Sequence, residues 1–262
     1  MTWTTRPRSK IAGQAAIDLG DGPYHILMLH GVGLRAEAWS AQIDAFAATA
    51  RVIAPDMPGH GQSGLPASRL TLTDYVQCAA DVLASLQGPT IVVGHSMGSM
   101  LALDLAGHHA DAVCGVVALN AVFQRSAAAR DAVIKRADAL DGESTPDPTA
   151  TLTRWFGDAP SAERNACATW LREVDPSAYK MAYTAFANST SPTPEALAAL
   201  PCPACFITGS AEPNSTPDMS TRMADLTPRG EVAIVEGAAH MMPMTHAAEV
   251  NRIISNFMSK VV

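Results

Sequence analysis

A short apolar run that ends in a glycine-flanked serine is the feature that most constrains the fold of this chain. The run TIVV at residues 90–93 is β-branched and apolar, as expected of a strand that is buried on both faces. The pentapeptide GHSMG follows at residues 94–98, and leucines and alanines at helical spacing continue to Ala106. The glycines let strand and helix approach closely, because neither carries a side chain. The sequence therefore predicts a sharp strand–turn–helix with the Ser96 hydroxyl at its tip.

Similar apolar runs alternate with helical patterns along much of the chain. We expect strands at His25 to Leu29, Arg51 to Ala54, Thr90 to Val93, Gly115 to Leu119, Ala204 to Thr208 and Glu231 to Val235. We expect helices near residues 38–48, 72–86, 97–108, 217–226 and 245–259. This alternation predicts an α/β fold, in which a mostly parallel, doubly wound sheet carries helices on both faces.

The segment from residue 123 to residue 199 interrupts this alternation. It has helical patterns at residues 130–140 and 162–173 and loops rich in proline and glycine, but no apolar run typical of a buried strand. We therefore expect residues 1–122 and 200–262 to form one core, with residues 123–199 inserted between two core strands as a helical cap. The cap is expected over the carboxyl ends of the strands, where ligands bind in open α/β sheets.

Composition argues against several classes of function. The 262 residues include 25 acidic and 18 basic side chains, and a formal charge of -7 disfavours a nucleic-acid partner. No apolar stretch reaches the roughly 20 residues of a membrane span, and the N-terminus lacks the apolar region of a secretion signal. We therefore expect a cytoplasmic protein without a membrane partner. The five cysteines are scattered and odd in number, so reduced thiols are expected.

The strand–turn–helix with Gly-x-Ser-x-Gly resembles the nucleophile elbow of the α/β-hydrolase family. HGVG at residues 30–33 follows the first predicted strand and GAAH at residues 237–240 follows the last, so the resemblance covers nearly the whole chain. It implies an α/β-hydrolase fold and a serine hydrolase activity. By this resemblance Ser96 is the nucleophile and His240 the general base, and the backbone N–H groups of Val32 and Met97 form the oxyanion hole.

The acid that would orient His240 is indicated by its position. Family members usually carry an aspartate three residues after the glycine that ends the penultimate core strand, and Glu212 occupies that place here. Glutamate is an accepted alternative in this fold. Asp218 is the second candidate, although a carboxylate there also suits the first turn of the following helix. The other position where the fold accommodates an acid holds Asn120.

Residues of the cap are the candidates for substrate contacts. We expect Trp155, Phe156 and Arg154 at the substrate, and further cations that could hold a substrate carboxylate are Arg125, Arg130, Lys135 and Arg136. The cap, with its WF pair after an arginine and DPSAY at residues 175–179, resembles that of 3-oxoadipate enol-lactonases and related small-ester hydrolases. The resemblance implies a small-molecule ester or lactone substrate, cleaved through an acyl-enzyme intermediate.

No cofactor is expected, because the implied chemistry requires none and the chain lacks a dinucleotide- or phosphate-binding glycine motif. No metal site is expected either. Cys202 and Cys205 have redox spacing, but no second ligand cluster accompanies them, and Cys205 opens an apolar run that favours burial. Two alternatives stay open: a carbon–carbon bond hydrolase of ring-fission products, and a non-catalytic ligand-binding member of the fold. The oligomeric state is also left open.

Overall fold

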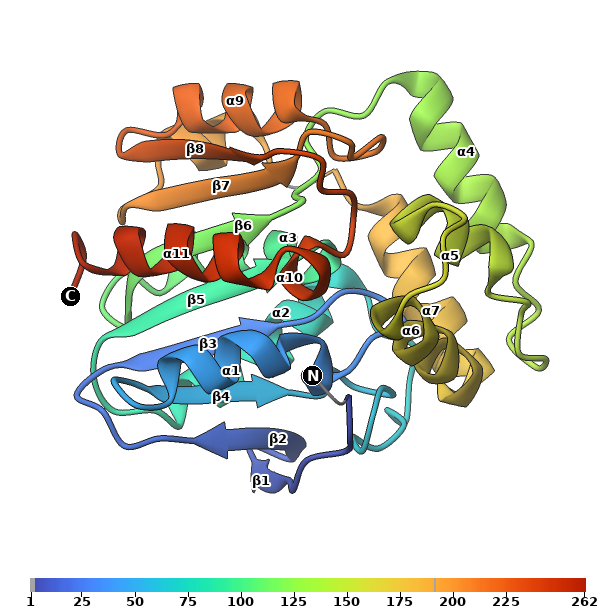
Figure 1. Cartoon of the computed structure of the whole chain (residues 1–262), viewed down its shortest axis with the longest axis horizontal. Helices are drawn as coiled ribbons and strands as arrows, with labels where there is room; N and C mark the ends of the chain where they lie inside the picture. The colour runs from blue at the N-terminus through green and yellow to red at the C-terminus, as the bar shows by residue number, and fades with distance from the viewer. Residues whose placement is uncertain (1–2, 191) are drawn as a thin grey trace.

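An eight-stranded sheet forms the centre of the molecule in a computed structural model, which describes residues 3–190 and 192–262 (Figure 1). The spatial order of its strands is β1-β2-β4-β3-β5-β6-β7-β8. The strands are β1 Ser9–Ile11, β2 Gln14–Leu19, β3 His25–Leu29, β4 Arg51–Pro55, β5 Thr90–His95, β6 Val113–Leu119, β7 Ala204–Gly209 and β8 Gly230–Val235. The pairings β1–β2 and β2–β4 are antiparallel, and every pairing from β4 to β8 is parallel. The fold is therefore the mostly parallel α/β sheet that the sequence predicts.

The structure contains a hairpin of β1 and β2 that is not predicted from the sequence. β1 has three residues, none of them buried, and β2 reads QAAIDL, in which Ile17 is the one β-branched side chain. Such segments lack the apolar, β-branched run that marks a buried strand. Pairing with β4, where Ala16 lies opposite Pro55, still holds β2 in the sheet.

Each face of the sheet has its own hydrophobic core. In β3, Leu27 and Leu29 point to one face, whereas Ile26 and Met28 point to the other. The first face is covered by α2 Leu72–Ala84, α3 Met97–His108 and α9 Pro217–Leu226. The second face is covered by α1 Ser40–Phe46 and α11 Ala247–Met258, which lie in front of the sheet in Figure 1. Burial on both faces explains why the central strands are continuous apolar runs.

Two predicted helices differ from the observed ones. The helix expected at residues 38–48 begins as a 3₁₀ turn, Ala36–Trp39, before α1. The helix expected at residues 245–259 is observed as α11, which begins at Ala247. A separate short helix, α10 Met242–Thr245, precedes it, and His246 between the two has φ -122° and ψ 38°, outside the helical range. The observed bounds of α3 and α9 agree with the prediction.

Five helices connect β6 to β7 in the described part of the chain, and we call them the cap helices. They are α4 Ala127–Asp138, α5 Thr149–Phe156, α6 Ala162–Glu173, α7 Pro176–Asn188 and α8 Pro194–Ala198. Figure 1 shows α4 to α7 beside the arrowheads of the parallel strands. Four cap helices begin at residues whose side chains accept a backbone N–H of the first turn, namely Ser126, Ser161, Asp175 and Thr193. As the arrowheads in Figure 1 show, the carboxyl ends of the parallel strands lie beside the cap helices α4 to α7.

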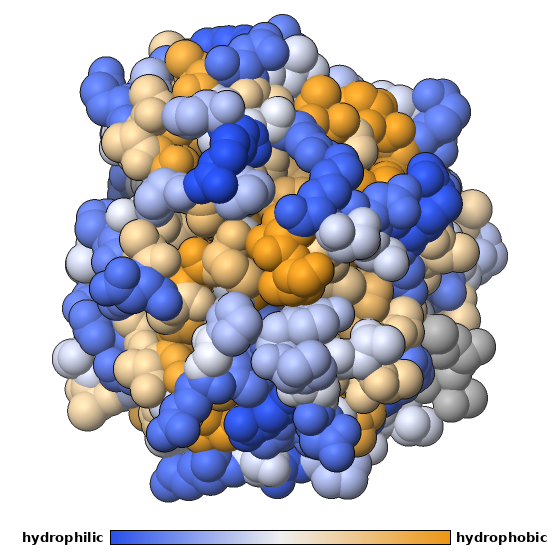
Figure 2. Space-filling view, turned by 90° about the vertical axis from the view of Figure 1, so that its left-hand side faces the viewer, coloured by the Kyte–Doolittle hydropathy of each residue, from blue (hydrophilic) through white to orange (hydrophobic). Residues whose placement is uncertain are grey.

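The end of the molecule remote from the cap helices carries a mixed surface. Hydrophilic side chains alternate there with apolar ones, and an apolar group lies near the centre of the face (Figure 2).

Among residues 3–190 and 192–262, no helix is long and apolar enough to cross a membrane.

The start of α3 passes very close to the sheet. A Cβ added to Gly98 would lie 2.0 Å from the carbonyl oxygen of Leu29 in β3, and a Cβ added to Gly94 would lie 2.1 Å from the carbonyl oxygen of Gly98. Real Cβ atoms do not approach an oxygen so closely. Glycine is therefore required at both positions for β5, α3 and the end of β3 to meet at this point.

We predict that Gly98→Ala destabilises the protein by about 1–3 kcal/mol or more, because backbone must move to admit the new Cβ. Gly107→Ala is the matched control in the same helix, since a Cβ there meets no atom within 4 Å. The control is expected to be neutral or to stabilise by up to about 1 kcal/mol. Urea unfolding measures both free energies, and equal effects would contradict the close approach.

Candidate active site

Ser96 occupies the turn between β5 and α3 in a strained backbone conformation. Its φ is 57° and its ψ is -119°, a combination that residues with a side chain rarely adopt. Hydrogen bonds hold the turn: the Ser96 N–H donates to the Leu119 carbonyl at 2.9 Å, and the Ser99 N–H donates to the Ser96 carbonyl at 3.0 Å. The strained turn leaves the Ser96 side chain in the wall of a cavity.

His240 lies in the loop between β8 and α10, and its ring is hydrogen bonded to Glu212. The distance from Nδ1 to Glu212 Oε2 is 2.8 Å, and both side chains are buried. The other carboxylate oxygen, Oε1, accepts the N–H groups of Asn214 at 2.7 Å and Ser215 at 3.2 Å. Burial alone would raise the pKa of Glu212, but His240 and these donors lower it to about 2. The ionised carboxylate orients Nδ1–H toward itself and leaves Nε2 of His240 as a proton acceptor.

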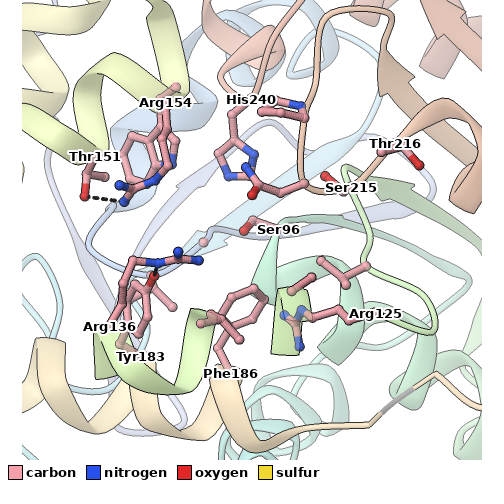
Figure 3. A pocket seen from close by; sticks show the side chains of 18 of the residues that line it. Ser96, Arg125, Arg136, Thr151, Arg154, Tyr183, Phe186, Ser215, Thr216 and His240 are labelled. Atoms are coloured by element: carbon pink, nitrogen blue, oxygen red, sulfur yellow. Dashed lines mark hydrogen bonds between the residues drawn. The ribbon is translucent and has the colours of Figure 1, made fainter. Parts of the chain in front are cut away.

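Ser96 and His240 line the same cavity, which has a volume of about 400 Å³. Figure 3 shows the Ser96 hydroxyl beneath the His240 ring. The two residues are 144 positions apart in the sequence: Ser96 directly follows β5, and His240 lies in the loop after β8. The cavity wall thus brings together a strained serine, a histidine and, behind the histidine, a buried carboxylate.

Two backbone N–H groups beside Ser96 have no partner in the part of the chain that the structure describes. Neither the Val32 N–H nor the Met97 N–H donates to an acceptor within residues 3–190 and 192–262. Val32 lies in the loop after β3, and this loop touches the serine: a Cβ added to Gly31 would lie 3.0 Å from the Ser96 Cβ. The loop is fixed by His30, whose Nε2 accepts the Met57 N–H at 2.9 Å. Unpaired donors in such a fixed position are suited to bind a developing oxyanion.

Three arginines from the cap region line the cavity around these groups. Arg125 follows β6, Arg136 lies in α4 and Arg154 lies in α5 (Figure 3). Arg136 Nε donates to the Tyr183 hydroxyl at 3.0 Å, and Arg154 Nη2 donates to the Thr151 hydroxyl at 2.9 Å. Among the described residues, no aspartate or glutamate lines this cavity.

Arg125 is partly enclosed. Its Cζ lies 4.4 Å from the centre of the Phe186 ring, and its Nη2 is buried without a hydrogen-bond partner in the described chain. Burial lowers the pKa of Arg125 to about 10, and the like charges of Arg136 and Arg130 act in the same direction. A buried cation without a counter-ion is costly. An anionic ligand in the cavity would remove that cost.

The structure separates the predicted cap residues into two groups. Trp155 lines the cavity and stacks on the His240 ring, with centroids 5.5 Å apart and planes 24° apart. Phe156, its neighbour, does not line the cavity and packs partly buried against the core. Arg130 lines a separate cavity beside Arg125, and Lys135 lines neither cavity. Of these predicted residues, Trp155, Arg125, Arg136 and Arg154 line the cavity that Ser96 also lines.

Asp218, the second candidate for the acid that orients His240, does not contact that histidine. It lies on α9, its side chain is 77% exposed, and a carboxylate oxygen stands 3.8 Å from Arg222 Nη1. Its position in the first turn after Pro217 is the one expected for a carboxylate at a helix N-terminus. The carboxylate in contact with His240 is that of Glu212.

Two side chains at the site were not expected to have a role of their own. In the sequence, His95 is one residue of the turn GHSMG. Asn120 occupies the other position where the fold accommodates an acid, and it carries no carboxylate. The structure places both against the backbone of His240. No sequence signal links these residues, because the contacts join segments at least 120 residues apart.

The other candidate groups lie apart from the cavity. Cys202 and Cys205 are both buried, and burial raises the pKa of their thiols to about 11 and about 12. Across residues 3–190 and 192–262, no three histidine, cysteine, aspartate or glutamate side chains are arranged to hold a metal ion.

Comparison with known proteins shows the family to which the chain belongs. A model of the alpha/beta hydrolase family matches residues 26–253. The (E)-2-((N-methylformamido)methylene)succinate hydrolase of Acinetobacter baylyi is 38% identical over 232 residues, which cover 87% of each chain. An esterase from Thermogutta terrifontis has the same fold, with a TM-score of 0.83 at 24% identity over 98% of this chain and 99% of the other. The enol-lactonase from Burkholderia xenovorans matches with a TM-score of 0.81 at 21% identity, over 97% of this chain and 100% of the other. The chain therefore belongs to the α/β-hydrolase family and is an enzyme of that family.

Proposed function

We propose that this chain is a serine hydrolase that cleaves a small, carboxylate-bearing acyl compound through an acyl-enzyme intermediate. One observation carries the proposal. Ser96 and His240 share their cavity with three arginines, and no acidic side chain of the described chain lines it. The serine and histidine supply acyl-transfer chemistry, and the unbalanced positive charge selects the substrate.

In the first half of the reaction, Ser96 Oγ attacks the carbonyl carbon of the substrate and its proton passes to Nε2 of His240. Glu212, held ionised, stabilises the resulting imidazolium through Nδ1. The N–H groups of Val32 and Met97 bind the carbonyl oxygen as it becomes negative. His240 then protonates the leaving group, the bond to it breaks, and an acyl group remains on Ser96.

In the second half, water replaces the leaving group. His240 Nε2 takes a proton from the water as its oxygen attacks the acyl carbon, and the same two N–H groups again bind the oxyanion. Collapse of this intermediate returns the proton to Ser96 Oγ and releases the carboxylic acid. The steps are the same for an ester, a lactone or an amide, which differ in the group that leaves.

The arginines and the Acinetobacter relative support a substituted succinate as the substrate class. The name of that relative describes an amide built on a succinate, a compound with two carboxylates. Three guanidinium groups are sufficient to hold two carboxylates, and arginine binds carboxylate in a bidentate manner. A cavity of about 400 Å³ suits a molecule of this size. The first compound to assay is therefore (E)-2-((N-methylformamido)methylene)succinate itself.

We further propose that residues 123–199 act as the cap that determines specificity. Arg125, Arg136 and Arg154 all belong to this segment, whereas Ser96 and His240 belong to residues 1–122 and 200–262. Chemistry and substrate choice would then reside in different parts of the chain. Changes in the cap should alter which acyl compound is cleaved without altering the steps of cleavage.

We predict that Ser96→Ala lowers kcat by at least about a thousandfold, because only binding and oxyanion stabilisation remain. Glu212→Gln should also lower kcat strongly, since the amide cannot stabilise the imidazolium. Asp218→Asn is the matched carboxylate control and should leave kcat unchanged, because Asp218 is exposed and the carboxylate bonded to His240 is that of Glu212. Steady-state hydrolysis of the succinate amide measures all three. A larger loss in Asp218→Asn than in Glu212→Gln would overturn the assignment of the acid.

We predict that Arg125→Met and Arg136→Met each lower kcat/KM for an anionic ester by about ten- to a hundredfold, the value of a hydrogen bond to a charged group. The matched substrates are mono-p-nitrophenyl succinate and neutral p-nitrophenyl butyrate, which are similar in length. The neutral ester should lose much less. Arg130→Met is the control variant, because Arg130 lies outside the wall of this cavity. Equal losses of kcat/KM for both esters would show that the arginines do not recognise the negative charge of the substrate.

A further inference from the structure

The backbone carbonyl of His240 is held by two buried side chains that come from neighbouring strand ends. His95 Nε2 lies 2.8 Å from this oxygen, and Asn120 Nδ2 lies 2.7 Å from it. A carbonyl oxygen only accepts hydrogen bonds, so both side chains donate to it. This assigns the Nε2–H tautomer to His95 and fixes the orientation of the Asn120 amide.

His95 connects the main chains of the two reacting residues. It is the last residue of β5 and directly precedes Ser96, so its bond to the His240 carbonyl links the nucleophile's strand to the base's loop. Its ring is enclosed by the His240 ring at 4.9 Å and by the Trp39 ring at 6.3 Å. Burial lowers the pKa of His95 to about 3, so the ring stays neutral and keeps its single donor hydrogen.

Asn120 extends the same connection to the acid. It follows β6 with a positive φ of 50°, a conformation that asparagine tolerates, and its N–H donates to the Ile207 carbonyl at 2.8 Å. Its Oδ1 is 3.0 Å from the Thr208 hydroxyl, which is also 2.7 Å from the Ser215 carbonyl. The Ser215 N–H in turn donates to Glu212. The single Thr208 hydrogen is donated to one of these two oxygens at a time, and these buried polar contacts link the His240 carbonyl to the loop that carries Glu212.

We propose that His95 and Asn120 are positioning residues that set the distance between His240 and Ser96. The inference rests on the function proposed above. Glu212 controls the rotation of the His240 ring through Nδ1, but it does not hold the main chain from which the ring extends. His95 and Asn120 supply that second constraint. Proton transfer requires both, because a misplacement of about 1 Å can cost about a hundredfold in rate.

The two donors are removed separately in the test. Asn120→Asp keeps the shape of the side chain but places an acceptor against the His240 carbonyl, and His95→Leu removes the other donor. Each is expected to lower kcat by about ten- to a hundredfold while KM changes less than about twofold. His95→Gln restores an N–H at a similar reach and should recover most of the turnover lost in His95→Leu. If the buried acid prevents folding, Asn120→Gly, which suits the positive φ, replaces Asn120→Asp.

Gln14→Glu is the matched control for a structural effect. Gln14 is also a buried amide that donates to a backbone carbonyl, that of Cys78 at 2.8 Å, but it is not among the residues that line the cavity. The control is expected to lower the melting temperature without lowering kcat per folded molecule. Thermal unfolding and active-site titration report the folded fraction for every variant.

A His240→Ala background decides whether the two residues act through the base. With His240 removed, the residual turnover depends on substrate binding and the oxyanion hole. Adding Asn120→Asp or His95→Leu should then cause no further loss. The same loss in both backgrounds, or an unchanged kcat in the folded single variants, would overturn the positioning role alone. Full turnover in His240→Ala itself would instead overturn the proposed function, and the positioning role with it.

Discussion

The contact between the first turn of α3 and the carbonyl of Leu29 is the constraint on which the site depends. Without a side chain at Gly98, α3 starts directly over the end of β3, and this approach forces Ser96 into its strained turn. The same approach brings the loop after β3 against the serine. The N–H groups of Val32 and Met97, which have no acceptor among the described residues, come from the two segments that meet there. One close packing contact therefore positions both the candidate nucleophile and the candidate oxyanion donors.

Two enclosed arginines, Arg8 and Arg125, differ in whether carboxylates lie beside them. In the core, Arg8 is enclosed but fully matched: it lies 2.7 Å from Glu37 and 2.8 Å from Asp56, and both carboxylates are buried. In the cavity, Arg125 is also enclosed, but its Nη2 has no partner in the described chain. Within the described residues, one enclosed arginine is therefore paired with two carboxylates, whereas the arginine that shares a cavity with Ser96 and His240 has no carboxylate beside it. This contrast is the physical basis for proposing an anionic substrate.

Local patterns account for what could be predicted from the sequence. The elbow around Ser96 is encoded within about ten residues, because the glycine spacing, the β-branched run and the helical pattern are all local. His240 was predicted from its place after the last strand. The hairpin of β1 and β2 was missed because its pairing with β4, rather than its own composition, holds it. Trp155 and Phe156 were predicted together, yet neighbours on a helix point about 100° apart, and only Trp155 faces the cavity. The partners of His95 and Asn120 were beyond prediction, because those contacts depend on the complete sheet.

The most direct test of the central claim is mass spectrometry of the enzyme quenched during turnover of (E)-2-((N-methylformamido)methylene)succinate. We expect a protein whose mass is increased by a formyl group, the acyl part of that amide, on the peptide that contains Ser96, while the succinate part leaves with the nitrogen. Mono-p-nitrophenyl succinate, whose acyl part carries the carboxylate, should instead give a succinyl adduct on the same residue. Turnover without an adduct, or an adduct on any other residue, would contradict the account.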